Sequence, residues 1–263
     1  MNIKNFSNKG FVVLKNSISL KLIKLIQKNI LENIKKKGKK KPYKNLNDAC
    51  KNLEDKSLFK IINPINKQLF NQNLINKVLL EKKIYNCLVS LLGSDLAVSS
   101  DSSLTINLPK KTKSYYFKDW HQEIWSGASV SNVQIWMPIF QKTGIDGQIN
   151  FIKESHKWGH VPHTNRKPIK LPENYQTVKS KLNIGDAIVF STTLMHKTMP
   201  ANNPRIALAM TIKNFKYNDF SYSDNFNWRI FSYSEITKIQ RLLGNHYLSP
   251  FRILNKNVDI DLN

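Results

Sequence analysis

The sequence predicts a mainly β protein, an antiparallel barrel or double-sheet jelly roll, whose N-terminal third is helical. Two observations lead to this prediction. After residue 95 the chain consists of short runs rich in β-branched and aromatic residues, separated by clusters of Gly, Pro, Asn and Asp. Before residue 95, apolar residues recur at helical spacing. Strands that follow one another without intervening helices are typical of antiparallel sheets and not of βαβ units.

The N-terminal third is expected to begin with a strand and a helix. A short β-like run at residues 10–14 (GFVVL) precedes residues 18–34, where apolar side chains return every three or four positions. Further helices are predicted at residues 47–53, 58–69 and 74–92. Pro64 is expected to interrupt the second of these, and Gly93 to end the third, long helix.

The strands expected after residue 95 are short and bounded by turn residues. They are residues 96–99, 103–108, 133–139, 148–152, 187–190 and 206–215. The tail contains one predicted helix, residues 234–243, with Ser234 as its N-cap and Glu235 or Thr237 in its first turn. No internal repeat or interdomain linker is visible. The chain is therefore interpreted as one domain, with 1–95 as helical wrapping, 96–215 as the jelly-roll core and 216–263 as a C-terminal extension.

The composition is that of a globular protein with a strongly basic charge balance. The formal net charge of +23 would ordinarily suggest a nucleic-acid partner. The excess is mainly lysine, however, and accompanies abundant Asn and Ile, which A/T-rich codons favour. The densest run, at residues 35–41 (KKKGKKK), is interpreted as a solvated helix end and loop. No nucleic-acid partner is therefore predicted, and tight, salt-sensitive binding in a shift assay would reverse that interpretation.

Cysteine use and hydropathy favour a reducing compartment without a membrane. Cys50 and Cys87 have no CxxC spacing and no neighbouring His, so neither a disulfide framework nor a thiolate metal site is indicated. The N-terminus lacks the apolar core of a signal peptide, and no stretch approaches the roughly 20 apolar residues of a membrane span. A cytoplasmic location is expected, and the oligomeric state is left open.

The segment DWHQE at residues 119–123 is the most informative part of the sequence. Side chains alternate between the two faces of an extended strand, so His121 and Glu123 are expected to project to the same face. One strand would then offer an imidazole and a carboxylate side by side. A lone HxE is more often a surface or hydrogen-bonded pair than a ligand pair, so the interpretation depends on further groups.

His196 and Arg205 provide those further groups. His196 ends the run GDAIVFSTTLMH, and two histidines with one carboxylate on one side of a metal form the facial triad of non-haem Fe(II) oxygenases. No thiolates accompany them, which argues against a structural zinc. Arg205 follows nine residues later, after a turn rich in Pro and Asn. Its guanidinium fork matches a carboxylate and can grip the distal carboxylate of 2-oxoglutarate.

Over most of its length the sequence resembles the phytanoyl-CoA dioxygenase-like family of 2-oxoglutarate oxygenases. FSNKGFVVLKN is similar to that family's opening strand before a helix, and WHQE to its WHQD motif. VQIWMPI followed by DGQINFIKESHKWGH is similar to its core strand, Gly-containing turn and PGSHK-type loop. GDAIVF, with the distal His196 and Arg205, completes the pattern.

The resemblance implies a cupin-like double-stranded β-helix and an oxidoreductase that uses Fe(II), 2-oxoglutarate and O2. Such a dioxygenase releases succinate and CO2 and hydroxylates its substrate, here expected to be a small molecule. It implies the catalytic metal ligands His121, Glu123 and His196, and the co-substrate residues Arg205, Trp136 and Asn107. The basic charge balance favours an anionic substrate, although codon bias accounts for the same charge.

Two departures from the family pattern affect the interpretation. Glu123 stands where the family usually has Asp, one methylene shorter, but it keeps an anionic oxygen ligand. Relatives that halogenate replace this carboxylate with a small residue, so Glu123 argues against halogenation. Residues 153–155 read KES where Pro-Gly-Ser is usual, which changes the expected substrate rim. The alternative function is a catalytically inactive cupin-like protein that binds a metal or ligand.

Other candidate residues have ordinary structural explanations. His156, His160 and His163 share no carboxylate at ligand spacing, so a rim loop or solvated residues are expected in place of a second metal site. Buried packing is the default role of the tryptophans. Trp125 and Trp158 are nevertheless the ones expected on the substrate side.

Overall fold

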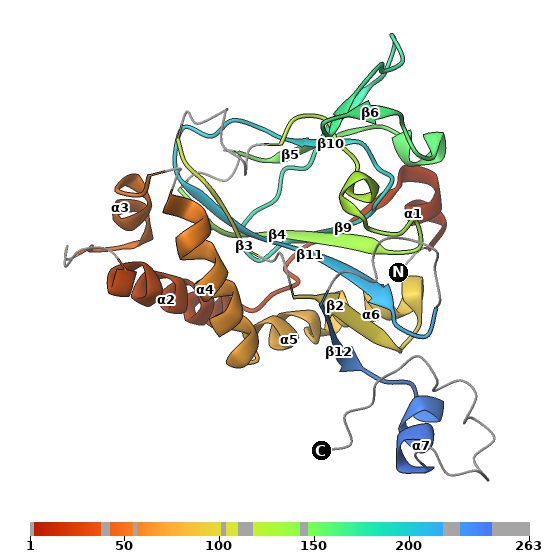
Figure 1. The fold of residues 1–263 in the computed structure, drawn as a ribbon, viewed down its shortest axis with the longest axis horizontal. Helices are drawn as coiled ribbons and strands as arrows, with labels where there is room; N and C mark the ends of the chain where they lie inside the picture. Colours follow the sequence, from red (N-terminus) through yellow and green to blue (C-terminus); the bar gives the residue numbers. More distant parts are fainter. Residues whose placement is uncertain are drawn as a thin grey trace.

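The computed structural model describes residues 3–37, 43–54, 57–100, 104–109, 118–142, 147–217 and 227–243. Most of the basic run at 35–41, and the first residue of the strand expected at 103–108, lie outside these ranges. Within them the fold is mainly β, built from antiparallel sheets with helices against one face, which confirms the predicted fold class (Figure 1).

Two antiparallel sheets form the centre of the molecule. The main sheet has the order β1 (Phe11–Leu14), β9 (Ala187–Ser191), β4 (Val133–Gln141), β11 (Arg205–Asn214), β2 (Leu96–Ser99) and β12 (Trp228–Ser232), and β3 (Leu104–Asn107) also pairs with β11. The smaller sheet has the order β10 (His196–Thr198), β5 (Ile149–Ile152) and β8 (Thr177–Lys179). A short hairpin joins β6 (His163–Thr164) and β7 (Lys167–Pro168). The edge strands of the main sheet, β1 and β12, thus lie outside residues 96–215.

Both faces of the main sheet are apolar, because successive side chains along a strand point to opposite faces and belong to two different cores. On β4, Ile135 and Met137 belong to the large core under the helices, whereas Trp136 belongs to a smaller core that includes Phe151 of β5. On β11 the alternation is the same, and the side chains facing the smaller sheet are Arg205, Ala207, Ala209 and Thr211. The space between the sheets is therefore bordered on β11 by small residues and one arginine.

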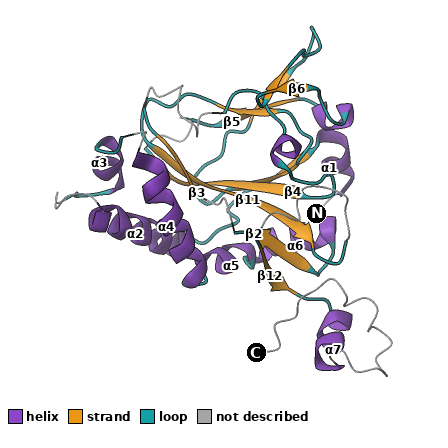
Figure 2. Ribbon diagram, in the orientation of Figure 1, coloured by secondary structure: helices purple, strands orange, loops and turns teal. Residues whose placement is uncertain are grey.

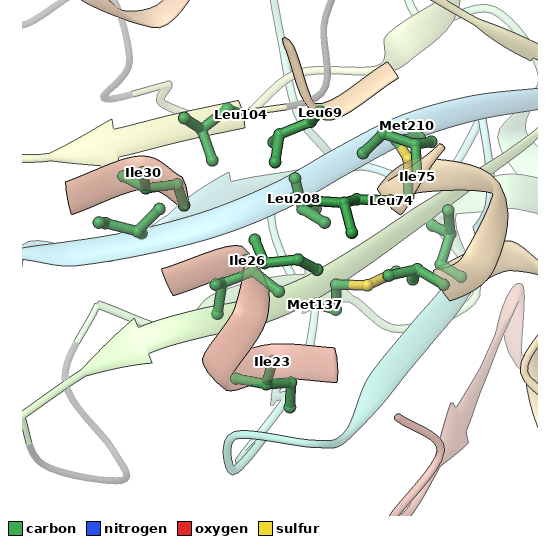
Figure 3. Close-up of a cluster of buried hydrophobic side chains, with 14 of the residues drawn as sticks. Ile23, Ile26, Ile30, Leu69, Leu74, Ile75, Leu104, Met137, Leu208 and Met210 are labelled. Atoms are coloured by element: carbon green, nitrogen blue, oxygen red, sulfur yellow. The ribbon is translucent and has the colours of Figure 1, made fainter. Parts of the chain in front are cut away.

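Helices from the N-terminal third cover the other face of the main sheet (Figure 2). They are α2 (Leu20–Lys37), α3 (Leu46–Lys51), α4 (Leu58–Asn71), α5 (Leu74–Leu79) and α6 (Lys82–Leu92). Figure 3 shows apolar side chains of α2, α4 and α5 packed against β3, β4 and β11, among them Ile26, Leu69, Ile75, Met137 and Leu208. Burying each such side chain stabilises the fold by about 1.5–3 kcal/mol.

Two predictions about these helices are wrong. The long helix expected at residues 74–92 is two helices, because Glu81 has an extended backbone (ψ 128°) and its carboxylate accepts a hydrogen bond from the Ser19 N–H. Pro64 does not interrupt α4 but lies inside it. Ile62, Ile65 and Leu69 beside it are buried, and at about 1.5–3 kcal/mol each they outweigh a proline penalty of about 3 kcal/mol.

The two ends of the described chain carry further helices. Helix α1 (Ile3–Lys9), which the sequence did not indicate, precedes β1. Helix α7 (Glu235–Leu243) matches the predicted tail helix, and the Ser234 hydroxyl accepts a hydrogen bond from the Thr237 N–H, which confirms Ser234 as its N-cap. No helix in the described ranges is both long and apolar enough to cross a membrane.

Asp186 connects the edge strand β1 to the rest of the main sheet. Its carboxylate accepts hydrogen bonds from Lys15 Nζ at 2.8 Å and from the backbone N–H groups of Asn16 and Asn183, both at 2.9 Å. Burial raises the pKa of Asp186, but these hydrogen bonds outweigh burial, and the net pKa lies below its ordinary value. The ionised carboxylate therefore stabilises the fold.

Candidate metal centre

The two candidate histidine ligands are held opposite each other by backbone hydrogen bonds. His121 forms an isolated antiparallel β-bridge with His196, the first residue of β10. The His121 N–H donates to the His196 carbonyl at 2.9 Å, and the His196 N–H donates back at 3.0 Å. Their rings lie side by side, with centroids 4.1 Å apart. This pair of backbone bonds places both imidazoles at one point between the sheets.

Glu123 reaches the same point, although the extended strand expected through it is wrong. Only Gln122 between the two residues is extended (φ −113°, ψ 146°), and Glu123 begins a 3-10 turn, Glu123–Ser126. One extended residue is enough to direct His121 and Glu123 to the same side. The turn is fixed by the Glu123 N–H, which donates to the Thr192 carbonyl at 2.9 Å.

The three side chains converge on one small volume. Glu123 Oε1 lies 3.2 Å from His196 Nε2 and 3.7 Å from His121 Nε2, and one ligand atom from each residue lies within 4.8 Å of the others. Adjacent ligands of an octahedral ion with bonds near 2.1 Å are about 3 Å apart. The spacing therefore suits a single metal ion bound on one face.

Both imidazoles have the tautomer that a metal ligand needs. His121 Nδ1 lies 2.7 Å from the Asp119 carbonyl and His196 Nδ1 lies 2.9 Å from the Leu194 carbonyl. Nδ1–H therefore donates to backbone in each ring, and the Nε2 lone pair faces the centre. His121 Nε2 is buried without a hydrogen-bond partner among the described residues, which fits a metal-binding atom.

The electrostatics keep the ligands in their metal-binding protonation states. Burial, and to a smaller extent the neighbouring His196, lower the pKa of His121 to about 4 against an opposing effect of Glu123. Burial raises the pKa of Glu123, but Lys118 and the contacts with both imidazoles outweigh it, so that pKa lies well below its ordinary value. A neutral imidazole and a carboxylate are thus present at neutral pH. Two nitrogens and one oxygen suit Fe(II).

Arg205, Trp136 and Asn107 lie together beside the ligands. Arg205 is 2% exposed, and its Nη2 donates a hydrogen bond to Asn107 Oδ1, the residue opposite it on β3. Its guanidinium carbon lies 4.9 Å from the centre of the Trp136 ring. These two contacts aim the guanidinium along the space between the sheets. The structure thus brings together all three residues expected at the co-substrate.

Gly147 gives Arg205 the room it occupies. A Cβ at Gly147 would lie 3.2 Å from Arg205 Cδ and 3.0 Å from the Cβ of Ala201. The backbone there also has φ +68°, which favours glycine. Gly147 is therefore part of the support of the arginine, a role that the sequence pattern alone did not indicate.

One cavity connects the metal ligands with Arg205. It has about 450 Å³ of space not filled by atoms, part of it open to solvent. Its described lining consists of the three ligands and Thr105, Lys118, Gln134, Trp136, Ile149, Phe190, Thr198, Arg205 and Ala209. Ala209 and Ala207 of β11 are small enough to leave this space open.

Trp125 and Trp158 are not among the described residues that line this cavity. They belong to an aromatic cluster with Trp120, and the Trp125 ring stacks on His163 at 4.6 Å between centroids. His156 contacts the Ser7 carbonyl through Nε2 at 2.8 Å. The substrate-side assignment of the two tryptophans stays a prediction. The His156 contact is a structural one, which differs from the rim loop or solvated residues expected there.

Gln122 is a functional residue that the sequence interpretation missed. It lies between His121 and Glu123, and its side chain points away from them. Its amide donates to the carbonyls of Gly159 and Thr193, and its Oε1 accepts from the Val161 N–H at 2.9 Å. The alternation of side chains along an extended segment could have indicated this role. If His121 and Glu123 face the metal, the residue between them must face the opposite side.

Comparison with known proteins places this geometry in a family. No curated protein matches the chain in sequence. Among solved structures, the apo form of the non-heme monooxygenase ThoJ has a TM-score of 0.55 at 15% identity, covering 88% of this chain and 84% of that one. The epimerase SnoN, in complex with Fe3+, alpha ketoglutarate and nogalamycin RO, has a TM-score of 0.51 at 12% identity, covering 80% and 81%. At these identities the likeness shows a shared fold.

The family model described as phytanoyl-CoA dioxygenase (PhyH) matches residues 6–207, which is most of the chain. The match runs from α1 to the third residue of β11 and includes the three converging ligands and Arg205. The resemblance inferred from the sequence is confirmed. The chain therefore belongs to the phytanoyl-CoA dioxygenase family, and is a non-haem enzyme that depends on iron and 2-oxoglutarate.

Proposed function

We propose that the chain is a dioxygenase that hydroxylates a small molecule, with iron held by His121, Glu123 and His196 and 2-oxoglutarate held by Arg205. The observation that carries the proposal is the convergence of the three ligand atoms within 4.8 Å of one another. When bound, iron and 2-oxoglutarate supply the oxidising power for the reaction with O2. The protein supplies the geometry.

The chain orients the ligands and keeps them ready to bind. The carbonyls of Asp119 and Leu194 hold both Nδ1–H groups, so the two Nε2 atoms are aimed at the metal position. The β-bridge fixes the distance between the rings before any metal arrives. Glu123 contributes the negative charge that balances part of the charge of the ion.

Arg205 is the proposed partner of the distal carboxylate of 2-oxoglutarate. It faces the same cavity as the ligands, and a guanidinium can donate two parallel hydrogen bonds to a carboxylate. Asn107 and Trp136 hold its plane through a hydrogen bond and a stacked ring. Their proposed role is to position Arg205, and Trp136, which lines the cavity, also contacts the co-substrate.

Hydroxylation is the outcome that the cavity lining supports best. The fold also occurs in an epimerase, and an epimerase must return hydrogen to the opposite face of a carbon, which a phenol or a thiol can donate. No Tyr or Cys lines the described part of this cavity. Glu123 occupies the position that a halogenating enzyme leaves free for halide. Transfer of oxygen to the substrate is therefore the simplest reaction for this site.

The first experiment is anaerobic addition of 2-oxoglutarate to the Fe(II)-loaded protein. We expect the weak visible charge-transfer band of a bidentate complex, and its loss or weakening in Arg205→Ala, because the distal carboxylate loses its partner. Arg229→Ala is the matched control, since Arg229 is exposed and packs on Phe70 outside the cavity. A missing band in folded wild-type protein would contradict the proposal.

The second experiment separates turnover from binding. With O2 and a panel of small molecules, the wild-type protein is expected to form succinate and a product that is heavier by one oxygen atom, labelled when 18O2 is used. A normal band without succinate under any of these conditions would favour the alternative of a protein that binds the cofactors but does not turn over. A product without added oxygen would contradict hydroxylation.

A further inference from the structure

Lys118 is fixed to the metal centre by the same strand pairing that holds the histidines. The Thr198 N–H donates to the Lys118 carbonyl at 2.9 Å, one step along from the paired bonds between His121 and His196. Thr198 is the last residue of β10, which begins with His196. The backbone of Lys118 is thus connected to β10 by one hydrogen bond, and its half-buried side chain lines the cavity.

No acidic side chain in the described ranges forms an ion pair with Lys118. Its ammonium lies beyond 4 Å from every described carboxylate, Glu123 included, and no hydrogen bond of Nζ is found among these residues. Its charge nevertheless acts on the site, because its side chain lines the same cavity as Glu123. A cation held half-buried in a cavity without a partner costs free energy unless a ligand supplies the opposite charge.

When both cofactors are counted, the net charge of the site is one positive charge. The described lining carries two cations, Lys118 and Arg205, and one carboxylate, Glu123. The two charges of Fe(II) and the two of 2-oxoglutarate cancel each other. Because Arg205 is the proposed partner of the co-substrate, the remaining charge is that of Lys118. A substrate with one negative charge would make the loaded site neutral.

The rest of the lining indicates what kind of anion fits. Gln134 lines the cavity, and its Oε1 accepts a hydrogen bond from the Thr211 hydroxyl at 2.8 Å, so the amide N–H groups are the donors that this side chain has left to offer a ligand. Ile149, Phe190 and Ala209 are apolar walls. The cavity therefore presents donors and apolar surface, and offers no carboxylate in its described part other than the metal ligand.

We infer that Lys118 is a specificity-determining residue that binds an oxyanion group of the substrate, a carboxylate or a phosphate, and so places a neighbouring apolar part of that substrate at the metal. This inference rests on the proposed function, because it presumes that 2-oxoglutarate occupies the Arg205 side of the cavity. The substrate class is a small organic acid or phosphate ester, and a neutral analogue such as the amide or methyl ester is rejected.

The test uses inorganic phosphate and acetate as probes, so no substrate has to be known. The protein is loaded with Mn(II) and 2-oxoglutarate, and the paramagnetic relaxation of phosphate (31P) and acetate (13C) is measured as each is titrated. We expect saturable relaxation in the wild type and in Lys118→Arg. In Lys118→Gln the apparent affinity should fall at least about tenfold, because a charge-assisted hydrogen bond is lost. Lys179→Gln, an exposed lysine of β8, controls for net charge.

Each other outcome overturns the inference. Unchanged relaxation in Lys118→Gln would show that the anion binds the metal or another surface. An absence of saturable relaxation in the wild type would show that there is no anion site. If Lys118→Gln weakens 2-oxoglutarate binding instead, Lys118 belongs to the co-substrate. If wild-type protein binds no 2-oxoglutarate, the proposed function fails, and the same titration with Mn(II) alone still tests the anion site.

Discussion

His121 and His196 exchange backbone hydrogen bonds across a β-bridge, at 2.9 and 3.0 Å, while their rings meet at 4.1 Å between centroids. The metal ligands are therefore positioned by the main chain and not by the metal. A site that is formed in advance needs little rearrangement on binding, and its affinity depends mainly on the donor atoms. We expect the far-ultraviolet circular dichroism to stay unchanged when Fe(II) is added.

Replacing Glu123 separates the effect of its charge from that of its shape. In Glu123→Ala the affinity for Fe(II) should fall by more than about 100-fold, because loss of an outer-shell partner alone costs 10–100-fold. Glu123→Gln keeps the shape without the charge and should lie between Ala and wild type. Anaerobic calorimetric titration measures the affinity. Glu32→Ala, on the exposed face of α2, is the control, and equal affinity in Glu123→Ala and wild type would rule out Glu123 as a ligand.

Gln122 is expected to stabilise the backbone around the site through its hydrogen bonds, without binding the metal. Gln122→Ala removes three hydrogen bonds and leaves the buried Thr193 carbonyl and the buried Val161 N–H without their partner, which should lower the free energy of unfolding by about 2–4 kcal/mol. Urea denaturation measures this change. Gln27→Ala, which removes one hydrogen bond to the Ile139 carbonyl, should cost less. A loss below that of Gln27→Ala would contradict the positioning role.

Two glycines distinguish steric contact from backbone strain. Gly147 and Gly159 have nearly the same φ, +68° and +70°, but a Cβ at Gly147 would press on Arg205 whereas one at Gly159 meets nothing within 4 Å. Both alanine variants should lose stability, because positive φ favours glycine. Only Gly147→Ala should also weaken 2-oxoglutarate binding, measured by titration of the visible band. Equal co-substrate affinity in the two variants would count against Arg205 as the binding residue.

Asp186 should make stability depend on pH in a defined direction. Its folded pKa lies below the ordinary value of 3.8, so its contribution is fully present above that pH and is lost as the pH falls through the folded pKa. At pH 7 Asp186→Asn should be less stable by about 1–3 kcal/mol. The difference from wild type should shrink below pH 3.8. Lys15→Met, which leaves both backbone donors, should cost under about 1 kcal/mol, and a difference that grows in acid would refute the assignment.

The sequence predicted the strands well and the helix boundaries less well, for physical reasons. The strands between 96 and 215 alternate side chains for two cores, and that period is visible in the sequence. The break at Glu81 has no Gly or Pro to mark it, since it is made by a hydrogen bond to distant Ser19. Strands β6, β7, β8, β10 and β12 were missed, and four of these five are only two or three residues long.

The ligands and Arg205 could be predicted because few chemistries need that combination of residues. Lys118, Gln134 and Gly147 could not, because their roles depend on which side chains lie across the cavity and not on sequence spacing. The position of Glu123 was predicted with the wrong local structure. Its direction was nevertheless correct, because a single extended residue, Gln122, fixes it.

The edge of the main sheet has a consequence for how the protein is made. Phe11 of β1 pairs with Phe190 of β9, so β1 lacks its partner until about 180 more residues have been synthesised, roughly 9–36 s at 5–20 residues per second. During that time the apolar run FVVL is an unpaired strand. Closure of such a long loop also slows folding. Chaperone contact during translation is therefore expected to determine the yield of this protein more than the stability of its folded state does.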